Sequence, residues 1–282
     1  MKKITRRSFM AAAGLTVAAL ALTACGGSSS TASSTAASSV ASSAAASSEA
    51  ASAAATELTT VEAGKLTMAT NAAFPPYEMT TDAGEFEGID IETAQAIADK
   101  LGLELQIDDM DFDAALLSVQ QGKADIVMAG VTVTDERKAV MDFSDSYATG
   151  IQSIIVPEGS DIASHDDLAG KKIGTQRGTT GYIYCSDDFG DENVVAYDDG
   201  LTAVQALNNG QVDAVVIDNA PAKEFVAANP GLVILDTSYA EEDYAIGMAK
   251  GSSLEDAVNA ALEELKADGT LQSIVDKYIT AE

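Results

Sequence analysis

Short apolar runs alternate with segments of helical periodicity from residue 64 nearly to the C-terminus, and this alternation constrains the fold more than any other feature. Residues 64–70 (GKLTMAT) predict a buried strand, and residues 89–102 predict a helix that ends at Gly102. Alternating strands and helices are typical of α/β layers with a mainly parallel sheet. Further strands are predicted at 103–109, 124–130, 151–157, 171–176, 193–197 and 213–218, and further helices at 111–123, 252–269 and 270–279.

Two segments of the chain share one pattern. Residues 120–130 (QQGKADIVMAG) and 208–218 (NNGQVDAVVID) each contain a helix end, a glycine turn, an aspartate and an apolar strand. Helix–glycine–strand is a common connection, so the match alone does not prove a repeat, but it suggests two similar α/β lobes. In open α/β sheets, ligands bind beyond the carboxyl ends of the strands. The pattern therefore predicts Gly130 and Asp218 at matching strand ends that face a cleft.

The first 24 residues predict a cleaved export signal. A basic start (MKKITRR) leads into an apolar run that is short for a membrane span. The run ends in LTAC, which resembles the lipobox of bacterial lipoproteins and so implies cleavage before Cys25 and lipidation of Cys25. TRRSFM also resembles a twin-arginine signal, and the alternative of an ordinary basic start stays open. Residues 25–57, mostly Ser, Ala and Thr, predict a flexible tether to a folded part at 58–282.

The composition excludes several kinds of partner and site. The chain carries 44 acidic and 16 basic residues, for a net charge of −28, so nucleic-acid phosphates would be repelled. Cys185 is the only cysteine besides Cys25, so we expect no intramolecular disulfide. The single histidine, His165, lies in a polar stretch without a His/Cys cluster. We therefore expect no transition-metal site, no cofactor and no Ser–His catalytic pair.

An unusual arginine marks the candidate site. Thr134 is a suitable N-cap for a short helix at 135–140, and Arg137 occupies the third helical position, where a capping box carries Glu or Gln. A cation near the positive end of a helix is mildly unfavourable unless an anion binds there. The alternative is a surface ion pair with an adjacent acid. We expect Arg137 to face the cleft, and Asp135 and Glu136 to face solvent.

The segment that contains this arginine, AGVTVTDERKAVMDFSDSY (129–147), resembles the signature of polar amino-acid substrate-binding proteins of ABC importers. The resemblance implies a two-lobed periplasmic-binding-protein fold of type II, in which two lobes close on a two-strand hinge. Lobe 1 would comprise 58–151 and 245–282, lobe 2 would comprise 152–244, and the hinge crossings would lie near 149–154 and 242–247. Other motifs in this resemblance are ATNAAFPPYE (69–78), FEGIDIETAQAIADKLG (86–102), MDFDAALLSVQQGKADIVMAGVTVTDER (110–137), DDLAGKKIGTQRGTTG (166–181) and DGTLQSIVDKYI (268–279).

The resemblance also implies roles for individual residues. Arg137 would bind the α-carboxylate of an amino acid, and Asp218 would bind its α-ammonium. Three residues would donate hydrogen bonds to the ligand carboxylate: Gly130, Thr132 and Thr179. Two aromatic rings would flank the aliphatic part of the ligand: Phe74 and Phe112. Each has a structural alternative, which is core packing for the two phenylalanines and helix capping for Asp218 and Thr179.

Two positions bear on the ligand's side chain. Asn71 stands where several relatives have an aspartate, which predicts a neutral polar ligand rather than a basic one. Gln176 and Arg177 lie at the mouth of the second lobe, where Gln176 is a candidate ligand contact. Arg177 could favour an acidic ligand or point into solvent, and the sequence leaves this open.

These features predict a monomeric lipoprotein on the outer face of the cytoplasmic membrane. It would deliver a polar, neutral L-amino acid to an ABC permease–ATPase complex by opening and closing its lobes. One alternative is a dehydratase-like enzyme for small carboxylates on the same fold, for which Glu78, Asp82 or Asp90 could supply an acid or base. A sensory module is a second alternative, but the sequence given stops just after the last predicted helix, which argues against it.

Overall fold

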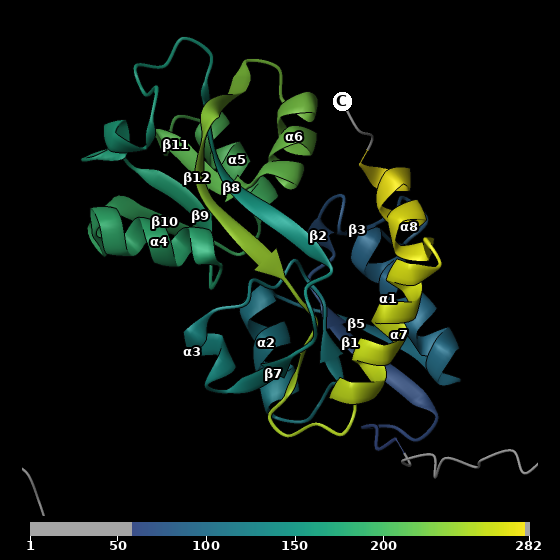
Figure 1. The fold of residues 1–282 in the computed structure, drawn as a ribbon. Coiled ribbons are helices and arrows are strands. Elements are labelled where there is room, and N and C mark those ends of the chain that lie inside the picture. The colour runs from purple at the N-terminus through teal and green to yellow at the C-terminus, as the bar shows by residue number, and fades with distance from the viewer. Residues whose placement is uncertain (1–57, 280–282) are drawn as a thin grey trace, which may run out of the picture. The chain divides into compact units, whose positions relative to one another are not determined.

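The structure is a computed structural model that describes residues 58–279. The predicted export signal, Cys25 and the whole of the predicted tether lie outside the described residues. Figure 1 shows the described residues as two groups of strands and helices, one formed around β8–β12 and the other around β1, β5 and β7.

The first group is built on a five-stranded sheet with the order β5-β1-β6-β13-β7. Strand β1 pairs in parallel with β5 and β6, and β13 runs antiparallel between β6 and β7. Alternate side chains of β1 enter different cores, because Leu66 and Met68 pack with one set of helices and Ala69 packs with another. The strands are β1 (Lys65–Thr70), β5 (Glu104–Asp109), β6 (Ile126–Val127), β7 (Met141–Phe143) and β13 (Gly247–Ala249).

Helices cover both faces of this sheet. One face carries α1 (Ile89–Leu101), α7 (Glu255–Ala267) and α8 (Thr270–Tyr278), which lie against one another (Figure 1). The other face carries α2 (Phe112–Gln120), which packs on β1 and β13. The helices at 89–101 and 255–278 are close to the predicted ones, since their apolar periodicity is strong and glycines mark their ends.

The second group is built on a sheet with the order β10-β9-β11-β8-β12. Strand β9 pairs in parallel with β10 and β11, and β8 runs antiparallel between β11 and β12. The strands are β8 (Ala148–Pro157), β9 (Ile173–Gln176), β10 (Val194–Tyr197), β11 (Ala214–Asp218) and β12 (Leu232–Tyr244). The helices are α4 (Thr180–Phe189), α5 (Gly200–Asn208) and α6 (Asn219–Ala228). Two short 3₁₀ turns are η1 (His165–Leu168) and η2 (Asp191–Asn193).

The two sheets follow the same plan: three parallel strands, one strand that opposes them, and a final strand in the original direction. The segments with the shared sequence pattern supply β6 and β11, and each holds the third place in its sheet. The predicted two-lobed α/β fold is confirmed. We call the group containing β1 the first lobe and the group containing β8 the second lobe.

The chain passes from the first sheet to the second through residues 144–147 and returns through residues 245–246. These two crossings are hydrogen-bonded to each other: Ser144 N–H donates to the Ile246 oxygen at 2.9 Å, and Tyr147 N–H donates to the Tyr244 oxygen at 2.9 Å. The lobe boundaries and hinge positions derived from the sequence stay predictions.

Several elements differ from the prediction. The strand expected at 124–130 is regular only over β6, because the chain turns at Gly130, which has a positive φ of 56°. The short α3 (Asp135–Lys138) ends before residue 140. A small sheet of β2 (Ala73–Phe74), β3 (Glu78–Thr80) and β4 (Phe86–Glu87) was not predicted, since two- and three-residue strands carry too little periodicity.

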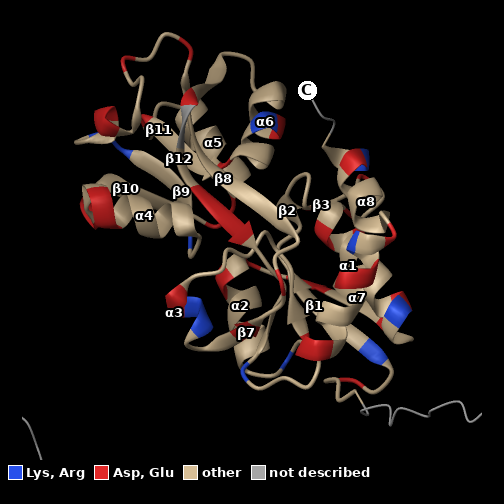
Figure 2. Ribbon diagram, in the orientation of Figure 1, with Lys and Arg blue, Asp and Glu red and all other residues tan. Residues whose placement is uncertain are grey.

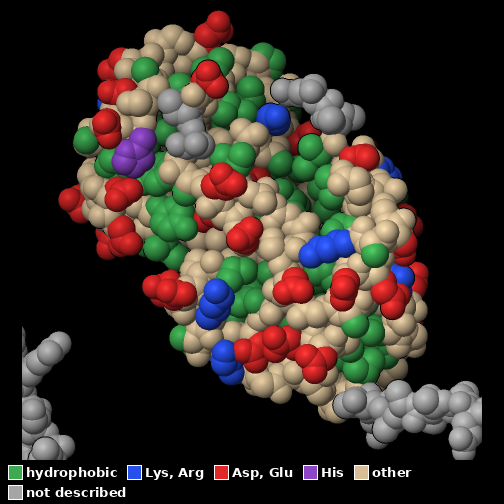
Figure 3. Space-filling view, viewed as in Figure 1, with side chains coloured by type: hydrophobic (Ala, Val, Ile, Leu, Met, Phe, Trp, Pro, Cys, Tyr) green, Lys and Arg blue, Asp and Glu red, His purple; other side chains and the backbone are tan. Residues whose placement is uncertain are grey.

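Acidic side chains dominate the surface. Figure 2 places Asp and Glu on helices, strands and loops of both lobes, and Figure 3 shows them spread over the visible face with few lysines and arginines between them. Within residues 58–279, no helix is long and apolar enough to cross a membrane. The same residues contain no group of three His, Cys, Asp or Glu side chains that could hold a metal ion.

Candidate functional site

A pocket lies between the two lobes and encloses about 390 Å³ of space not filled by protein atoms, open solvent at its mouth included. It forms where strands of both sheets end: Asn71 follows β1, Gln176 ends β9 and Asp218 ends β11. This is the position expected for a ligand site in open α/β sheets. The structure brings all nine predicted contact residues to this pocket: Asn71, Phe74, Phe112, Gly130, Thr132, Arg137, Gln176, Thr179 and Asp218.

Arg137 enters the pocket from the first turn of α3. Thr134 caps this turn as predicted, since its hydroxyl accepts a hydrogen bond from the Arg137 N–H at 3.2 Å. The Arg137 side chain is buried, whereas Asp135 and Glu136 are exposed as expected. Its guanidinium donates to the carbonyl oxygens of Thr132 at 2.8 Å and Gly178 at 3.1 Å.

The charge of Arg137 has no acidic partner. Among the described residues, no carboxylate lies within 4.0 Å of its guanidinium, which instead stands 5.4 Å from the centre of the Phe112 ring. Burial lowers the pKa of Arg137 because the charged form loses hydration. An arginine presents five N–H donors, so the two carbonyl contacts leave donors for a further acceptor. The site is thus suited to a planar anion such as a carboxylate.

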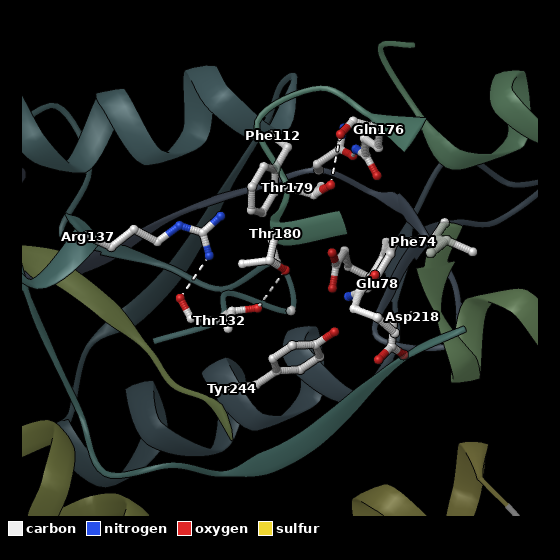
Figure 4. Close-up of a pocket in the computed structure, with 15 residues that line it drawn as sticks. Phe74, Glu78, Phe112, Thr132, Arg137, Gln176, Thr179, Thr180, Asp218 and Tyr244 are labelled. Atoms are coloured by element: carbon white, nitrogen blue, oxygen red, sulfur yellow. Dashed lines mark hydrogen bonds between the residues drawn. The ribbon is translucent and has the colours of Figure 1, made fainter. Parts of the chain in front are cut away.

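Asp218 lies across the pocket from Arg137 (Figure 4). It caps α6 by accepting the Ala220 N–H at 3.0 Å, and it accepts the Ile151 N–H at 2.8 Å through its other oxygen. Burial raises the pKa of Asp218 to about 6. The helix-cap alternative is therefore correct, and the same carboxylate also lines the pocket.

Glu78 is a second acid on the side of Asp218, and the sequence did not single it out as a ligand contact. It lies on β3 opposite Phe74 in the register of the β2–β3 pair, which brings both into the pocket. Its carboxyl group is fully buried and hydrogen-bonds with that of Asp90, and among the described residues neither oxygen accepts from any other N–H or O–H donor. Burial, reinforced by the nearby charge of Asp90, raises the pKa of Glu78 well above its ordinary value. The signal that could have found it is the acid four residues after Phe74.

Glu242 is a third buried acid, and it lies behind Thr132. Its Oε2 accepts hydrogen bonds from Thr132 Oγ1 at 3.1 Å and from Gln152 Nε2 at 3.0 Å. Thr132 also lies 3.4 Å from Thr180 Oγ1 across the lobe interface. Sequence reasoning missed Glu242 and Gln152, because the length of β12 and its pairing with β8 were not predicted, and it also missed Thr180 at the start of α4.

Two expected ligand donors are engaged inside the protein. The Gly130 N–H donates to Asp90 Oδ2 at 3.0 Å, and the Thr179 hydroxyl donates to the Gln176 oxygen at 2.8 Å. Thr179 also caps α4 by accepting the Tyr182 N–H at 3.3 Å, which is its structural alternative. Both residues line the pocket, but these two donors are already satisfied.

Side chains of the two lobes contact each other at the pocket mouth. Gln176 Nε2 donates to Asn71 Oδ1 at 2.8 Å, and Asn71 Nδ2 donates to the Met110 oxygen at 3.0 Å. Arg177 points away from the pocket, where its half-exposed guanidinium lies 3.3 Å from Asp198. Of the two roles considered for Arg177, the solvent-facing one agrees with the structure.

The model of the bacterial extracellular solute-binding proteins, family 3, matches residues 66–281. The chain belongs to this family. L-cystine-binding protein TcyJ of Escherichia coli (strain K12) is 33% identical over 226 residues, covering 78% of this chain and 85% of that protein. Arginine-binding extracellular protein ArtP of Bacillus subtilis (strain 168) is 33% identical over 228 residues, covering 77% and 87%. Among solved structures, an ancestral arginine-binding protein bound to glutamine has a TM-score of 0.74 and 42% identity, covering 78% of this chain and all of that one.

The family and these relatives are solute-binding proteins and not enzymes. The dehydratase-like alternative therefore has no support. Its candidate acids are also dispersed, because Asp82 is exposed on a turn, Asp90 is buried behind the pocket, and Glu78 alone lines it.

Proposed function

We propose that this solute-binding protein captures a polar L-amino acid between its lobes and delivers it to the permease–ATPase complex of an ABC importer. The observation that carries the proposal is the buried Arg137 guanidinium, which has no acidic partner and lies across the pocket from Glu78 and Asp218. A zwitterion suits this arrangement. Its carboxylate would take the free donors of Arg137, and its ammonium would approach Asp218.

The relatives support an amino acid as the ligand class. TcyJ is named for L-cystine, ArtP for arginine, and the ancestral protein was solved with glutamine. These molecules share the α-carboxylate and α-ammonium and differ in the side chain. The Phe74 and Phe112 rings would flank the aliphatic part of such a ligand. Thr132 and Gln176 would complete its polar contacts, and Thr179 would line the pocket without donating to the ligand.

The ligand's side chain is a finer part of the proposal. The expectation of a neutral side chain rested on Asn71, whose amide is bonded to Gln176 and Met110. Glu78 places a carboxyl group in the pocket, and among the described residues no N–H or O–H donor reaches its oxygens apart from the neighbouring carboxyl of Asp90. We propose that Glu78 accepts from the N–H groups of the side chain, a role that the amide of glutamine and the guanidinium of arginine can both fill. A purely aliphatic or acidic side chain would leave this buried acid unpaired or repelled.

We further propose that the chain is exported, cleaved before Cys25 and held by lipid at Cys25 on the outer face of the cytoplasmic membrane, as a monomer. The lipobox-like LTAC and the Ser/Ala-rich residues 25–57 support this proposal. Radiolabelled palmitate incorporation that disappears in Cys25→Ala would test it.

A thermal-shift screen of the twenty amino acids on the full chain tests the main proposal, because a ligand that binds only the folded state raises the melting temperature. We expect polar amino acids to give the largest rise, and Arg137→Ala to abolish it. Arg177→Ala is the matched control, since it removes the other arginine of the folded part, which faces solvent. If no amino acid shifts the protein, or if Arg137→Ala keeps the full shift, the proposal fails.

A further inference from the structure

Asp90 connects the pocket to the crossings between the lobes without lining the pocket itself. It lies in the first turn of α1 and is completely buried. One oxygen, Oδ2, accepts two hydrogen bonds, from the Gly130 N–H at 3.0 Å and from the Tyr147 hydroxyl at 2.8 Å. The first donor belongs to the pocket wall, and the second belongs to the crossing at 144–147.

The pocket end of this connection is tightly held. Gly130 follows β6 and packs so closely that an added Cβ would lie 2.9 Å from the Phe74 ring and 3.2 Å from the Tyr244 ring. Both rings line the pocket. A movement of Gly130 would therefore displace pocket-lining rings, and Asp90 holds the Gly130 N–H in place.

The hinge end is also held by specific bonds. Tyr147 uses its hydroxyl for Asp90 and its N–H for the Tyr244 oxygen, at 2.9 Å. Tyr244 is the last residue of β12 and directly precedes the return crossing at 245–246. Tyr147 therefore bonds both to Asp90 and to the end of β12, next to the other crossing.

We infer that Asp90 is a positioning residue for ligand capture, which makes the pocket wall at Gly130 and the paired crossings at 144–147 and 245–246 move as one unit. The physical basis is that one oxygen, Asp90 Oδ2, accepts hydrogen bonds from both the Gly130 N–H and the Tyr147 hydroxyl. A shift of either donor therefore changes the acceptor that the other donor meets. Hydrogen bonds to an ionised carboxylate are about twice as strong as neutral ones, so the connection is stiff. The inference rests on the proposed function, since capture requires the lobes to move on their crossings.

Tyr147→Phe is the sharpest variant, because it removes one oxygen atom and leaves the ring and the Asp90–Gly130 bond in place. Hydrogen-exchange mass spectrometry on the ligand-free full chain reports the coupling directly. We expect faster exchange both at 144–147 and at residues 128–132, although the Gly130 N–H keeps its own acceptor. A merely structural hydroxyl would change exchange at 144–147 alone.

Tyr197→Phe is the matched control. Tyr197 is half-buried on β10, and its hydroxyl has no hydrogen-bond partner among the described residues. We expect its exchange pattern at 128–132 and 144–147 to match the wild type.

Binding supplies a second readout, with L-arginine and L-glutamine as probes in calorimetry. We expect Tyr147→Phe to weaken binding of whichever probe binds the wild type by about five- to tenfold, the fold-change of roughly one lost hydrogen bond. Asp90→Asn should weaken it at least as much. The double variant should be no weaker than Asp90→Asn alone, because both changes remove one connection.

The inference is overturned if Tyr147→Phe leaves exchange at 128–132 at the wild-type rate, or if the two substitutions weaken binding additively. If Asp90→Asn does not fold, Tyr147→Phe decides alone. If the wild type binds neither probe, the proposed ligand class is in doubt, while the exchange comparison still decides the role of Asp90.

Discussion

The two walls of the pocket, one from each lobe, differ in whether their polar groups already have partners within the protein. The first-lobe wall holds ionisable groups with few partners among the described residues: Arg137 forms no ion pair, although the charge of Glu242 lies nearby, and Glu78 has only the carboxyl of Asp90 beside it. The second-lobe wall holds groups that already serve the fold, because Asp218 caps α6 and bonds Ile151, and Thr179 caps α4. Buried charge without a partner costs folding free energy. The first wall thus keeps polar groups available in the pocket, whereas the polar groups of the second wall also stabilise their own lobe.

Substitution of Asp218 tests the second wall and should have a larger effect than the substitutions of Glu78 and Thr179. Asp218→Ala removes the cap, the bond to Ile151 and the proposed ammonium partner. We expect a stability loss of about 1–3 kcal/mol and a binding loss of roughly a hundredfold. Chemical denaturation and calorimetry measure the two effects.

Asp218→Asn is its matched partner, because asparagine is as good an N-cap as aspartate. We expect near wild-type stability together with most of the binding loss. If Asp218→Asn binds as well as the wild type, the charge of Asp218 has no part in capture and the ammonium assignment is wrong.

Glu78→Gln tests the first wall. Glutamine keeps the size of the side chain and removes an acid whose ionised form is buried without a partner. We expect the ligand-free protein to gain stability, and binding of L-arginine to weaken about tenfold, the scale of one charge-assisted hydrogen bond. The affinity for L-glutamine should change less, because the neutral side-chain amide of this ligand forms no ion pair with Glu78 that could be lost. Equal changes for both amino acids would show that Glu78 does not read the side chain's charge.

The pH dependence should separate folding from binding. Burial raises the pKa of Asp90 and of Asp218 from the ordinary 3.8 to about 6, and raises that of Glu78 well above its ordinary value. The folded state then holds protons more tightly than the unfolded state between about pH 4 and 6, so these groups add stability as the pH falls through that window. An ammonium ligand needs ionised Asp218, so affinity should fall over the same change.

Melting temperature and dissociation constant at pH 7.5, 6.5 and 5.5 measure the two trends. Asp218→Asn should reduce the pH dependence of both the melting temperature and the dissociation constant in part, whereas Arg177→Ala should leave both unchanged. Affinity that rises on acidification would contradict the proposed role of Asp218.

Thr179→Ala should have the smallest effect on binding. The Thr179 hydroxyl caps α4 and donates to Gln176, so its loss should cost about 1 kcal/mol of stability. Binding should stay within about twofold of the wild type, because this hydroxyl is already engaged. A large binding loss at unchanged stability would instead restore Thr179 as a direct ligand donor.

Much of the fold was predictable because its signals are local. The helix at 89–101 shows a regular apolar face and a terminal glycine, and Thr134 shows the chemistry of an N-cap. The positions of Gly130, shortly after β6, and of Asp218, at the end of β11, followed from the repeated pattern and the general location of ligand sites in α/β sheets. The small sheet β2–β4 and the pairing of β12 with β8 have no comparable local signal.

The candidate site was predictable in two ways: one residue contradicts its local surroundings, and the other contact residues came from the family resemblance. Arg137 stood out as a cation in the first turn of a helix, among acids. Glu78 and Glu242 did not stand out, because an acid in an acidic chain is unremarkable until its burial is known. The internal acceptors of Gly130 and Thr179, Asp90 and Gln176, were not identifiable from the sequence, and the ligand-donor roles of both residues stay predictions.

The sequence by itself therefore determined the α/β class, the two similar lobes and the pocket position of Arg137 and Asp218, since periodicity, capping and strand ends are short-range properties. Only the tertiary structure decided which charges remain without partners and which donors are already used. Those outcomes depend on contacts between residues tens of positions apart. The link from Asp90 to Gly130 and Tyr147 is such a case, joining α1, the pocket wall and a crossing through one oxygen atom.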